Sequence, residues 1–387
     1  MIKRKITPFL KKMAGYFPVV TIMGPRQSGK TTLAKSVFKK YSAVNLEDKT
    51  ARELAAEDPK AFFELYPPPV IIDEVQRVPE LLSTIQVMAD SSKKKGQFIL
   101  TGSHQPKLHE GISQSLAGRT GIVNLLPLSI EELSAAGIVL SRDEYIFNGF
   151  MPRLYDEKIP PEILYQAYYS TYVERDVRQL INLNNQRSFE TFLKLLAGRV
   201  GQVVNLNGLA GDAGVSATTL ASWLSILEAS YITFRLPCYF ENFGKRLTKA
   251  PKIFFTDVGL ACSLLGIDSL DKVARDPLLG GLFENLVVLE ALKARYNCGK
   301  NAELYYFRAQ NNLEVDLILN DSRRLLPMEI KAGMTYSKSF ADNLRKFAKL
   351  AKNAGKPAVI YGGDTQATVG GVEFRNFRNT SKIIRPR

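Results

Sequence analysis

The sequence predicts an α/β protein that begins with a parallel sheet covered by helices and ends with a smaller mixed domain. Three observations support this fold class. Residues 18–23 form a short β-branched apolar run that leads into a glycine-containing loop and then a helix. Residues 70–74 form a second apolar run that ends in an acidic pair. The last third shows the order helix, three strands, helix and strand.

The composition is that of an ordinary globular chain. The 387 residues suffice for two or three domains, and 45% of them are hydrophobic while 23% are charged, so a disordered chain is excluded. Lysine and arginine number 52 against 38 acids, a net charge of +14. This excess favours nucleic acid, an acidic lipid surface or polyphosphate as partners, although charge alone is weak support for any of them.

Cysteine and histidine are too few for several kinds of site. Cys238, Cys262 and Cys298 show no C-x-x-C spacing, and His104 and His109 are the two histidines, so neither a disulfide framework nor a zinc site is indicated. No window approaches the about 18 to 20 apolar residues that span a bilayer. The basic first five residues are not followed by an apolar signal core. We therefore expect a cytoplasmic protein without a membrane partner.

The loop after the first strand reads G-P-R-Q-S-G-K-T and is followed by a helix from Thr32. In this strand–loop–helix context the pattern predicts a P-loop that binds ATP with magnesium. The glycines let backbone amides point at phosphate oxygens, Lys30 would reach the β and γ phosphates, and Thr31 would ligate magnesium. The alternative is a plain glycine turn before a helix. The residues predicted to hold the nucleotide here are Gly24, Pro25, Arg26, Gln27, Ser28, Gly29, Lys30, Thr31 and Thr32.

The acidic pair at the end of residues 70–74 matches a Walker B pattern. Asp73 would hold magnesium through water, and Glu74 would orient and deprotonate the attacking water. A glutamate at this position favours hydrolysis of ATP over transfer of phosphate to a metabolite. The sequence therefore predicts an ATP hydrolase.

Two further residues are candidates for the same site. Thr101 lies near the end of a third strand, where it would either sense the γ phosphate or begin a turn. Arg119 would contact nucleotide in its own chain or in a neighbouring copy within a homo-oligomer, or it would be a surface cation. The sequence leaves both interpretations of Arg119 open.

Several motifs in this order resemble the AAA-type ATPase module of a large prokaryotic family. They are G-P-R-Q-S-G-K-T, V-I-I-D-E-V-Q, F-I-L-T-G-S, L-A-G-R and L-L-P-L-S. The resemblance extends over nearly the whole chain, including residues 149–152 and 172–177. It implies a winged-helix segment and then a C-terminal domain of unknown function with a restriction-endonuclease-like fold. It also makes Arg175 a second candidate for sensing the nucleotide state.

The middle of the chain is expected to be helical. Residues 156–185 predict a tyrosine-rich helix whose tyrosines pack rather than stack on bases. Residues 216–229 predict a helix without lysine or arginine, which disfavours sequence-specific DNA reading. Residues 232–236 and 252–255 would be the strands of a wing. This wing would contact DNA phosphates through basic residues, namely Arg235, Lys245, Arg246, Lys249 and Lys252.

The C-terminal third carries the pattern of a PD-(D/E)xK nuclease. Glu329 and Lys331 are two apart in one strand and so share a face, while Asp316 lies in the preceding strand. Asp316 and Glu329 would hold magnesium at a phosphate, Lys331 would orient water, and Glu284 would support the metal site. The alternative is a strand with solvated charges. Residues 276–387 hold 18 bases against 11 acids, which favours an approach by DNA or RNA.

Together these patterns predict three domains. They are an ATPase domain over residues 1–155, a helical and winged-helix region over residues 156–270, and an αβββαβ restriction-endonuclease-like domain over residues 271–387. The leading hypothesis is an ATPase whose nucleotide state controls a metal-dependent nuclease-like domain acting on DNA. The alternatives are an ATP-driven switch or scaffold that binds a partner without cleavage, and a nucleic-acid-binding regulator.

Overall fold

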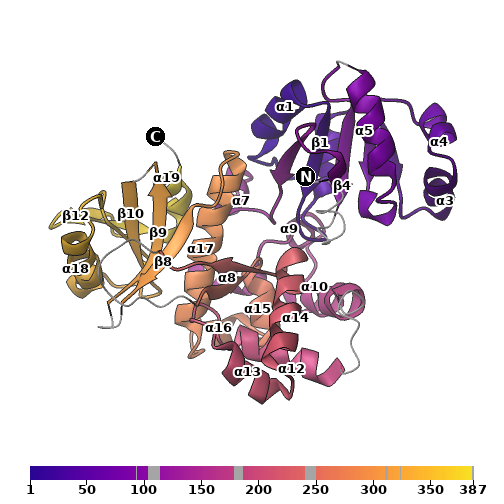
Figure 1. The fold of residues 1–387 in the computed structure, drawn as a ribbon. Coiled ribbons are helices and arrows are strands. Elements are labelled where there is room, and N and C mark those ends of the chain that lie inside the picture. The colour runs from indigo at the N-terminus through magenta and orange to yellow at the C-terminus, as the bar shows by residue number, and fades with distance from the viewer. Residues whose placement is uncertain are drawn as a thin grey trace. The chain divides into compact units, whose positions relative to one another are not determined.

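The structure, a computed structural model, describes residues 1–92, 94–102, 114–177, 186–239, 250–309, 313–322 and 324–385, with backbone only for 174–177. The chain forms two compact units. The first comprises Met1–Leu128 with two short later segments, Ala229–Tyr231 and Tyr296–Lys300, and the second comprises the rest. Figure 1 shows most of the first unit in indigo and purple, and the second from magenta to yellow. The three-domain division stays a prediction.

The first unit contains a five-stranded sheet whose strands are all parallel, in the order β2-β3-β4-β1-β5. Its strands are β1 (Val19–Met23), β2 (Ser42–Asn45), β3 (Val70–Asp73), β4 (Phe98–Gly102) and β5 (Thr120–Asn124). Every residue of β1, β3 and β4 is buried. For β1 this confirms the prediction of an apolar strand that is buried on both faces of a parallel sheet.

Helices cover both faces of this sheet (Figure 1). Among the described residues of this unit, the helices are α1 (Thr7–Tyr16), α2 (Lys30–Val37), α3 (Lys49–Glu57), α4 (Pro59–Leu65) and α5 (Leu81–Ser91). Alternate residues of β1 belong to different cores, because Val19 packs with Leu82 of α5, whereas Val20 packs with Leu33 of α2. The carboxyl ends of β1, β3 and β4 lie at one edge of the sheet, and the predicted nucleotide residues follow them there.

The second unit begins with helices, and the predicted helix over residues 156–185 differs from what is observed. Up to residue 273, the α-helices among its described residues are α7 (Ile130–Ala135), α8 (Arg142–Asn148), α9 (Pro152–Asp156), α10 (Pro161–Tyr168), α12 (Gln186–Ala197), α13 (Leu206–Ala213), α14 (Ala217–Ala229), α15 (Val258–Leu264) and α16 (Leu270–Val273). Helix α10 starts at Pro161, since proline fits the first helical turn, and continues as the π-helical η2 (Tyr169–Val177). Tyr165, Tyr168 and Tyr172 are buried, which confirms their packing role.

A hairpin follows the helix over residues 217–229. Strands β6 (Thr233–Leu236) and β7 (Lys252–Phe255) pair antiparallel, as predicted, and Lys245, Arg246 and Lys249 of the predicted wing lie outside the described residues. The prediction that Lys252 contacts DNA is wrong for this structure. Its side chain is only 3% exposed, because it forms ion pairs with two glutamates of the second unit. Arg235, the remaining wing base, pairs with Glu228.

The C-terminal part confirms the predicted order of helix, three strands, helix and strand, and it adds two strands and a helix. Its sheet has the strand order β12-β13-β11-β10-β9-β8. The elements are α17 (Leu279–Asn297), β8 (Leu304–Arg308), β9 (Glu314–Asp321), β10 (Arg324–Lys331), α18 (Asp342–Leu350), β11 (Ala358–Tyr361), β12 (Ala367–Val369), β13 (Val372–Asn376) and α19 (Thr380–Ile384). Its likeness to restriction endonucleases and the winged helix before it stay predictions.

Candidate functional site

The loop between β1 and α2 has a backbone conformation that requires glycine at two positions. Gly29 has φ 89°, in the left-handed region that favours glycine. A Cβ on Gly24 would collide with the carbonyl oxygen of Leu125, which follows β5. Ser28 Oγ donates to the Pro25 carbonyl at 2.9 Å and holds the loop in its curl. The two glycines of the motif are therefore required by a left-handed backbone and a close approach.

Lys30 folds back onto this loop. Its Nζ donates to the carbonyl oxygens of Gly24 at 3.0 Å and Pro25 at 2.8 Å. Burial lowers the pKa of Lys30 to about 8, against the opposing charges of Glu74 and Asp73. The ammonium is thus held by two neutral carbonyls beside two carboxylates, a position from which a phosphate would attract it.

Asp73, at the end of β3, is the point where three of the predicted residues meet. Its Oδ1 accepts a hydrogen bond from Thr31 Oγ1 at 2.7 Å and another from Thr101 Oγ1. Asp73 and Thr101 are buried. A carboxylate beside two hydroxyls offers only hard oxygen donors, the type that magnesium prefers, so these residues fit a magnesium ion.

Glu74, the next residue, has a strained backbone conformation. Its φ is 56°, in the left-handed region that residues other than glycine rarely adopt. Its Oε2 accepts a hydrogen bond from Nε2 of the buried Gln76. This amide fixes the direction in which the carboxylate points. No sequence pattern singles out Gln76, because a polar residue two positions after Glu74 has no distinctive spacing.

Arg26 and Arg119 both make ion pairs with acids. Arg119 Nε and Nη2 donate to the two oxygens of Asp90 on α5 at 2.5 and 2.9 Å. Arg26 pairs with Glu47 at 3.5 Å. In this structure Arg119 is therefore engaged as a surface cation, and its contact with nucleotide stays a prediction. Thr32 is exposed on the first turn of α2, and the side chain of Arg175 lies outside the described residues.

Arg4 also supports the P-loop, although it lies more than twenty positions before Ser28 in the sequence. No local sequence pattern predicts this contact. Its guanidinium donates to the Ser28 carbonyl at 2.7 Å and to the Leu126 carbonyl at 2.5 Å. It therefore ties the P-loop to the segment after β5. In the sequence Arg4 is one of several basic residues at the N-terminus.

The second predicted site forms a cluster of acids and lysines in the C-terminal part. Lys331 Nζ lies 2.7 Å from Glu329 and 3.8 Å from Asp316, and Asp316 Oδ2 accepts the backbone N–H of Ile330 at 2.8 Å. The structure thus brings together three of the four predicted residues. The prediction that Glu329 and Lys331 share a face is confirmed by their contact.

The fourth residue, Glu284 of α17, faces a different cation. Lys252 Nζ lies 2.8 Å from Glu284 and 2.6 Å from Glu314, two residues that no sequence pattern links to Lys252. Burial raises the pKa of Glu284 to about 8, although Lys252 opposes this shift. Burial and the charge of Asp316 raise the pKa of Glu329 to about 7. We define the acid–lysine cluster as Lys252, Glu284, Glu314, Asp316, Glu329 and Lys331.

The net negative charge of the acid–lysine cluster would favour the binding of a metal cation. Four carboxylates against two lysines leave a formal charge of −2 when all are ionised. Glu329 Oε2 is buried without a hydrogen-bond partner among the described residues. Among these residues no three His, Cys, Asp or Glu side chains are arranged to hold a metal. Asp316 and Glu329 still fit magnesium, which commonly takes one or two carboxylates and completes its shell with water and phosphate.

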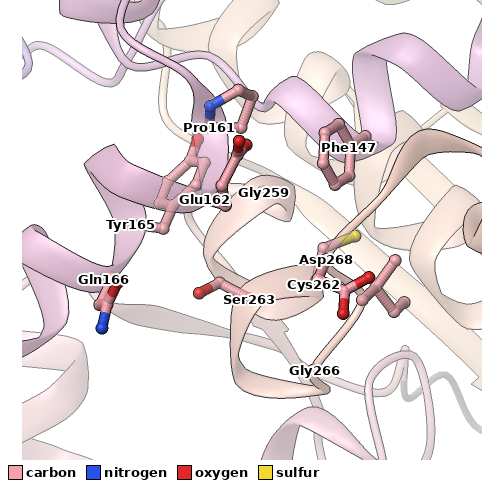
Figure 2. A pocket seen from close by; sticks show the side chains of 11 residues that line it. Phe147, Pro161, Glu162, Tyr165, Gln166, Gly259, Cys262, Ser263, Gly266 and Asp268 are labelled. Atoms are coloured by element: carbon pink, nitrogen blue, oxygen red, sulfur yellow. The ribbon is translucent and has the colours of Figure 1, made fainter.

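A cavity of about 260 Å³ lies elsewhere in the second unit, between α8, α10 and α15 (Figure 2). Phe147, Tyr165 and Cys262 form part of its wall, and Glu162 and Asp268 also line it. Burial raises the pKa of the Cys262 thiol well above its usual range, so this thiol is not a nucleophile at neutral pH. None of the predicted site residues lines this cavity.

Comparison with known proteins agrees with the geometry of the first unit. Residues 16–134 match the family described as AAA domain, so the first unit carries an ATP-binding P-loop ATPase domain of AAA type. Residues 140–271 and 279–377 match two domains of unknown function, DUF8612 and DUF4143. Among the described residues, no helix combines the length and the apolar character needed to cross a membrane.

The chain belongs to the family of the uncharacterized protein Rv2008c of Mycobacterium tuberculosis and the uncharacterized protein Mb2031c of Mycobacterium bovis. Each is 31% identical over 369 residues, which are 94% of this chain and 80% of the relative.

Two solved structures, among others, are similar to parts of the chain. One is the Walker-type ATPase of Pyrococcus abyssi, with 16% identity and a TM-score of 0.46 over 68% of this chain and 96% of that one. The other is AMPPCP-bound DnaA of Aquifex aeolicus, with 17% identity and a TM-score of 0.29 over 58% of this chain and 85% of that one.

Proposed function

We propose that the chain hydrolyses ATP with magnesium at the loop over residues 24–31. The observation that carries this proposal is the meeting of Thr31 and Thr101 on one oxygen of Asp73. Magnesium, when bound, would neutralise charge on the β and γ phosphates. The curled backbone of the loop offers its amides to phosphate, and the helix α2 adds the positive end of its dipole.

The residues around this point have separate roles in the proposal. Thr31 and Asp73 would exchange their mutual hydrogen bond for magnesium, directly or through water. Lys30 would leave the carbonyls of Gly24 and Pro25 and pair with phosphate. Glu74 would accept the proton of the attacking water, so that a water oxygen forms the new bond to the γ phosphorus as the bond to ADP breaks.

The test compares two site variants, at Lys30 and Glu74, with a control variant on helix α2. Lys30→Ala should abolish tight ATP binding, because it removes the ammonium from the phosphate site. Glu74→Gln should keep ATP binding and lose about 100-fold or more of the turnover, since general-base catalysis contributes about 10² to 10⁴ in rate. Lys35→Ala, an exposed lysine of α2, should change neither. Unchanged hydrolysis in either site variant would contradict the assignment.

For the C-terminal part we infer that the acid–lysine cluster forms a metal-dependent, nuclease-like site acting on DNA under control of the nucleotide state. Support comes from the contact of Lys331 with Asp316 and Glu329, and from the unpartnered Oε2 of Glu329. Asp316 and Glu329 would hold magnesium, which would polarise a scissile phosphodiester. Lys331 would hold the attacking water and the developing negative charge.

A second candidate function rests on the same residues. Two lysines already neutralise part of the acid–lysine cluster, and Glu284 pairs with Lys252 rather than with the other predicted ligands. This arrangement favours a binding switch or scaffold in which the cluster is a structural ion-pair network. Cleavage of DNA separates the two functions.

The experiment incubates supercoiled and single-stranded DNA with the full chain and magnesium or manganese, with and without ATP. Asp316→Asn is the inactive variant, and Asp342→Asn, an exposed acid of α18, is the matched control. Cleavage that Asp316→Asn lacks and Asp342→Asn retains would support the nuclease, and its response to ATP would show control. No cleavage under any condition would favour the switch.

A further inference from the structure

A second cavity, of about 480 Å³, opens over the C-terminal sheet and helix α19. Its lining comes from β9, β10, β11 and β13 of the sheet, from α19, and from the segments beside them. Five of its lining residues are cations, namely Arg324, Lys356, Arg375, Lys382 and Arg385. They face two acids, Asp321 and Glu373. We call this cavity the basic groove.

The cations of the basic groove are not all engaged. Lys356 and Arg375 share Glu373, at 2.6 and 3.0 Å, and the shared contacts lower the pKa of this glutamate. Arg385 pairs with Glu131. Arg324 and Lys382 form no ion pair with any residue that the structure describes. A guanidinium and an ammonium therefore remain for an anion from outside the protein.

The basic groove lies away from the acid–lysine cluster. Arg324 and Leu326, which line the groove, stand at even positions of β10, whereas Glu329 and Lys331 stand at odd positions. Successive residues of a strand point to opposite faces, so the groove and the cluster use opposite faces of this strand. Figure 1 shows α19 beside the upper ends of β9 and β10.

The chemistry of the basic groove favours phosphate groups on a small molecule. Its volume is within the range of about 300 to 1,000 Å³ typical of small-molecule sites. Guanidinium groups recognise phosphate through paired donors. Among the groove's described lining residues there is no aromatic side chain on which a base could stack, as single-stranded nucleic acid sites use. A cationic cavity of this size without such a platform fits a compact polyanion better than a polymer.

From these observations we propose that the basic groove binds a small phosphorylated ligand through Arg324 and Lys382. This site is distinct from the ATP loop and from the acid–lysine cluster, and it does not depend on hydrolysis at either. The basic groove lies over the same C-terminal sheet that carries the acid–lysine cluster.

The test is calorimetric titration of the full chain with tripolyphosphate, carried out in the Lys30→Ala background so that the P-loop does not compete for the probe. Removing Arg324 and Lys382 together, as Arg324→Gln with Lys382→Gln, should weaken binding about tenfold or more, since charge-assisted hydrogen bonds are lost. The matched control is Lys346→Gln with Lys349→Gln. These two exposed lysines of α18 carry the same formal charge and lie outside the groove.

Three results would overturn the proposal. They are no binding of tripolyphosphate, an equal loss in the α18 control, or tighter groove-dependent binding of a short single-stranded oligonucleotide than of tripolyphosphate. The last would identify a nucleic acid backbone as the ligand. Circular dichroism of each variant shows whether the fold is retained. ATP hydrolysis by the groove variant with Lys30 intact should equal that of the unaltered chain, which separates this proposal from the proposed ATPase.

Discussion

Gly24 shows how a single residue controls the proposed ATP site. The carbonyl of Leu125 occupies the space where any other side chain would begin, so the loop and the segment after β5 approach each other over the glycine. Arg4 ties the same two segments together from the N-terminus. The sequence motif predicts a glycine at this position. The structure explains why, because Gly24 approaches Leu125, which lies about a hundred positions later in the sequence.

We expect Gly24→Ala to displace the P-loop from the segment after β5. The added methyl group should destabilise the first unit by about 1 to 3 kcal/mol, as overpacking does, and should weaken ATP binding. The measurements are urea unfolding and nucleotide titration. Gly15→Ala is the control, since a Cβ there meets nothing within 4 Å. That change should leave ATP binding intact and stabilise α1 slightly. Equal ATP affinity in both variants would contradict the close approach.

At the scale of elements, β7 places Lys252 in a buried position that no sequence pattern predicts. Because Lys252 follows several basic residues, the sequence predicts that it contacts DNA phosphates as part of a wing. Instead it is buried between Glu284 of α17 and Glu314 of β9, with Tyr306 of β8 at 5.4 Å from its ammonium. One strand of the hairpin is thus joined electrostatically to the C-terminal sheet within the second unit.

Replacing Lys252 should therefore destabilise the second unit. Lys252→Met leaves two glutamates without their cation, and breaking a buried ion pair in this way costs about 3 to 5 kcal/mol. Adding Glu284→Gln to Lys252→Met should recover part of the loss, because one unpaired charge is removed. Urea unfolding measures both changes. Lys272→Met, which breaks an exposed pair with Asp268, should leave the unfolding midpoint unchanged. An unaltered midpoint for Lys252→Met would show that this ion pair is not buried in solution.

For the whole molecule, the first unit is not a continuous stretch of chain. Its first segment ends at Leu128, yet residues 229–231 and 296–300 belong to it. Tyr231 packs against its core, and its hydroxyl donates to Asn124 of β5 at 2.8 Å. The predicted ATPase domain over residues 1–155 leaves these segments out.

A chain that ends at residue 155 should consequently be less stable than the first unit within the full chain. We expect a lower midpoint of thermal unfolding for it, since it loses the packing of Tyr231 and the segment 296–300. Tyr231→Phe in the full chain should cost about 1 kcal/mol, the usual value of one hydrogen bond. Differential scanning calorimetry with and without ATP measures both. An equal midpoint for the short chain would show that residues 1–155 fold independently.

The sequence by itself determined the features that depend on local pattern. The P-loop, the acidic end of β3 and the order of the C-terminal strands follow from residue spacing, because a strand or a helix repeats with a fixed period. The alternation along β10 likewise predicted that Glu329 and Lys331 would meet, and the contact with Asp316 followed from pairing with the neighbouring strand. These features needed no knowledge of distant residues.

Only the tertiary structure decided which distant residues complete each site. Arg4 at the P-loop, Lys252 in the acid–lysine cluster, Tyr231 in the first unit and Arg324 beside Lys382 in the basic groove are all joined by contacts between remote positions. Such contacts depend on how whole elements pack, and a single lysine or tyrosine carries no spacing that reports its partner. The residue types of the two proposed sites are therefore predicted by the sequence, while the residues that support them are set by packing.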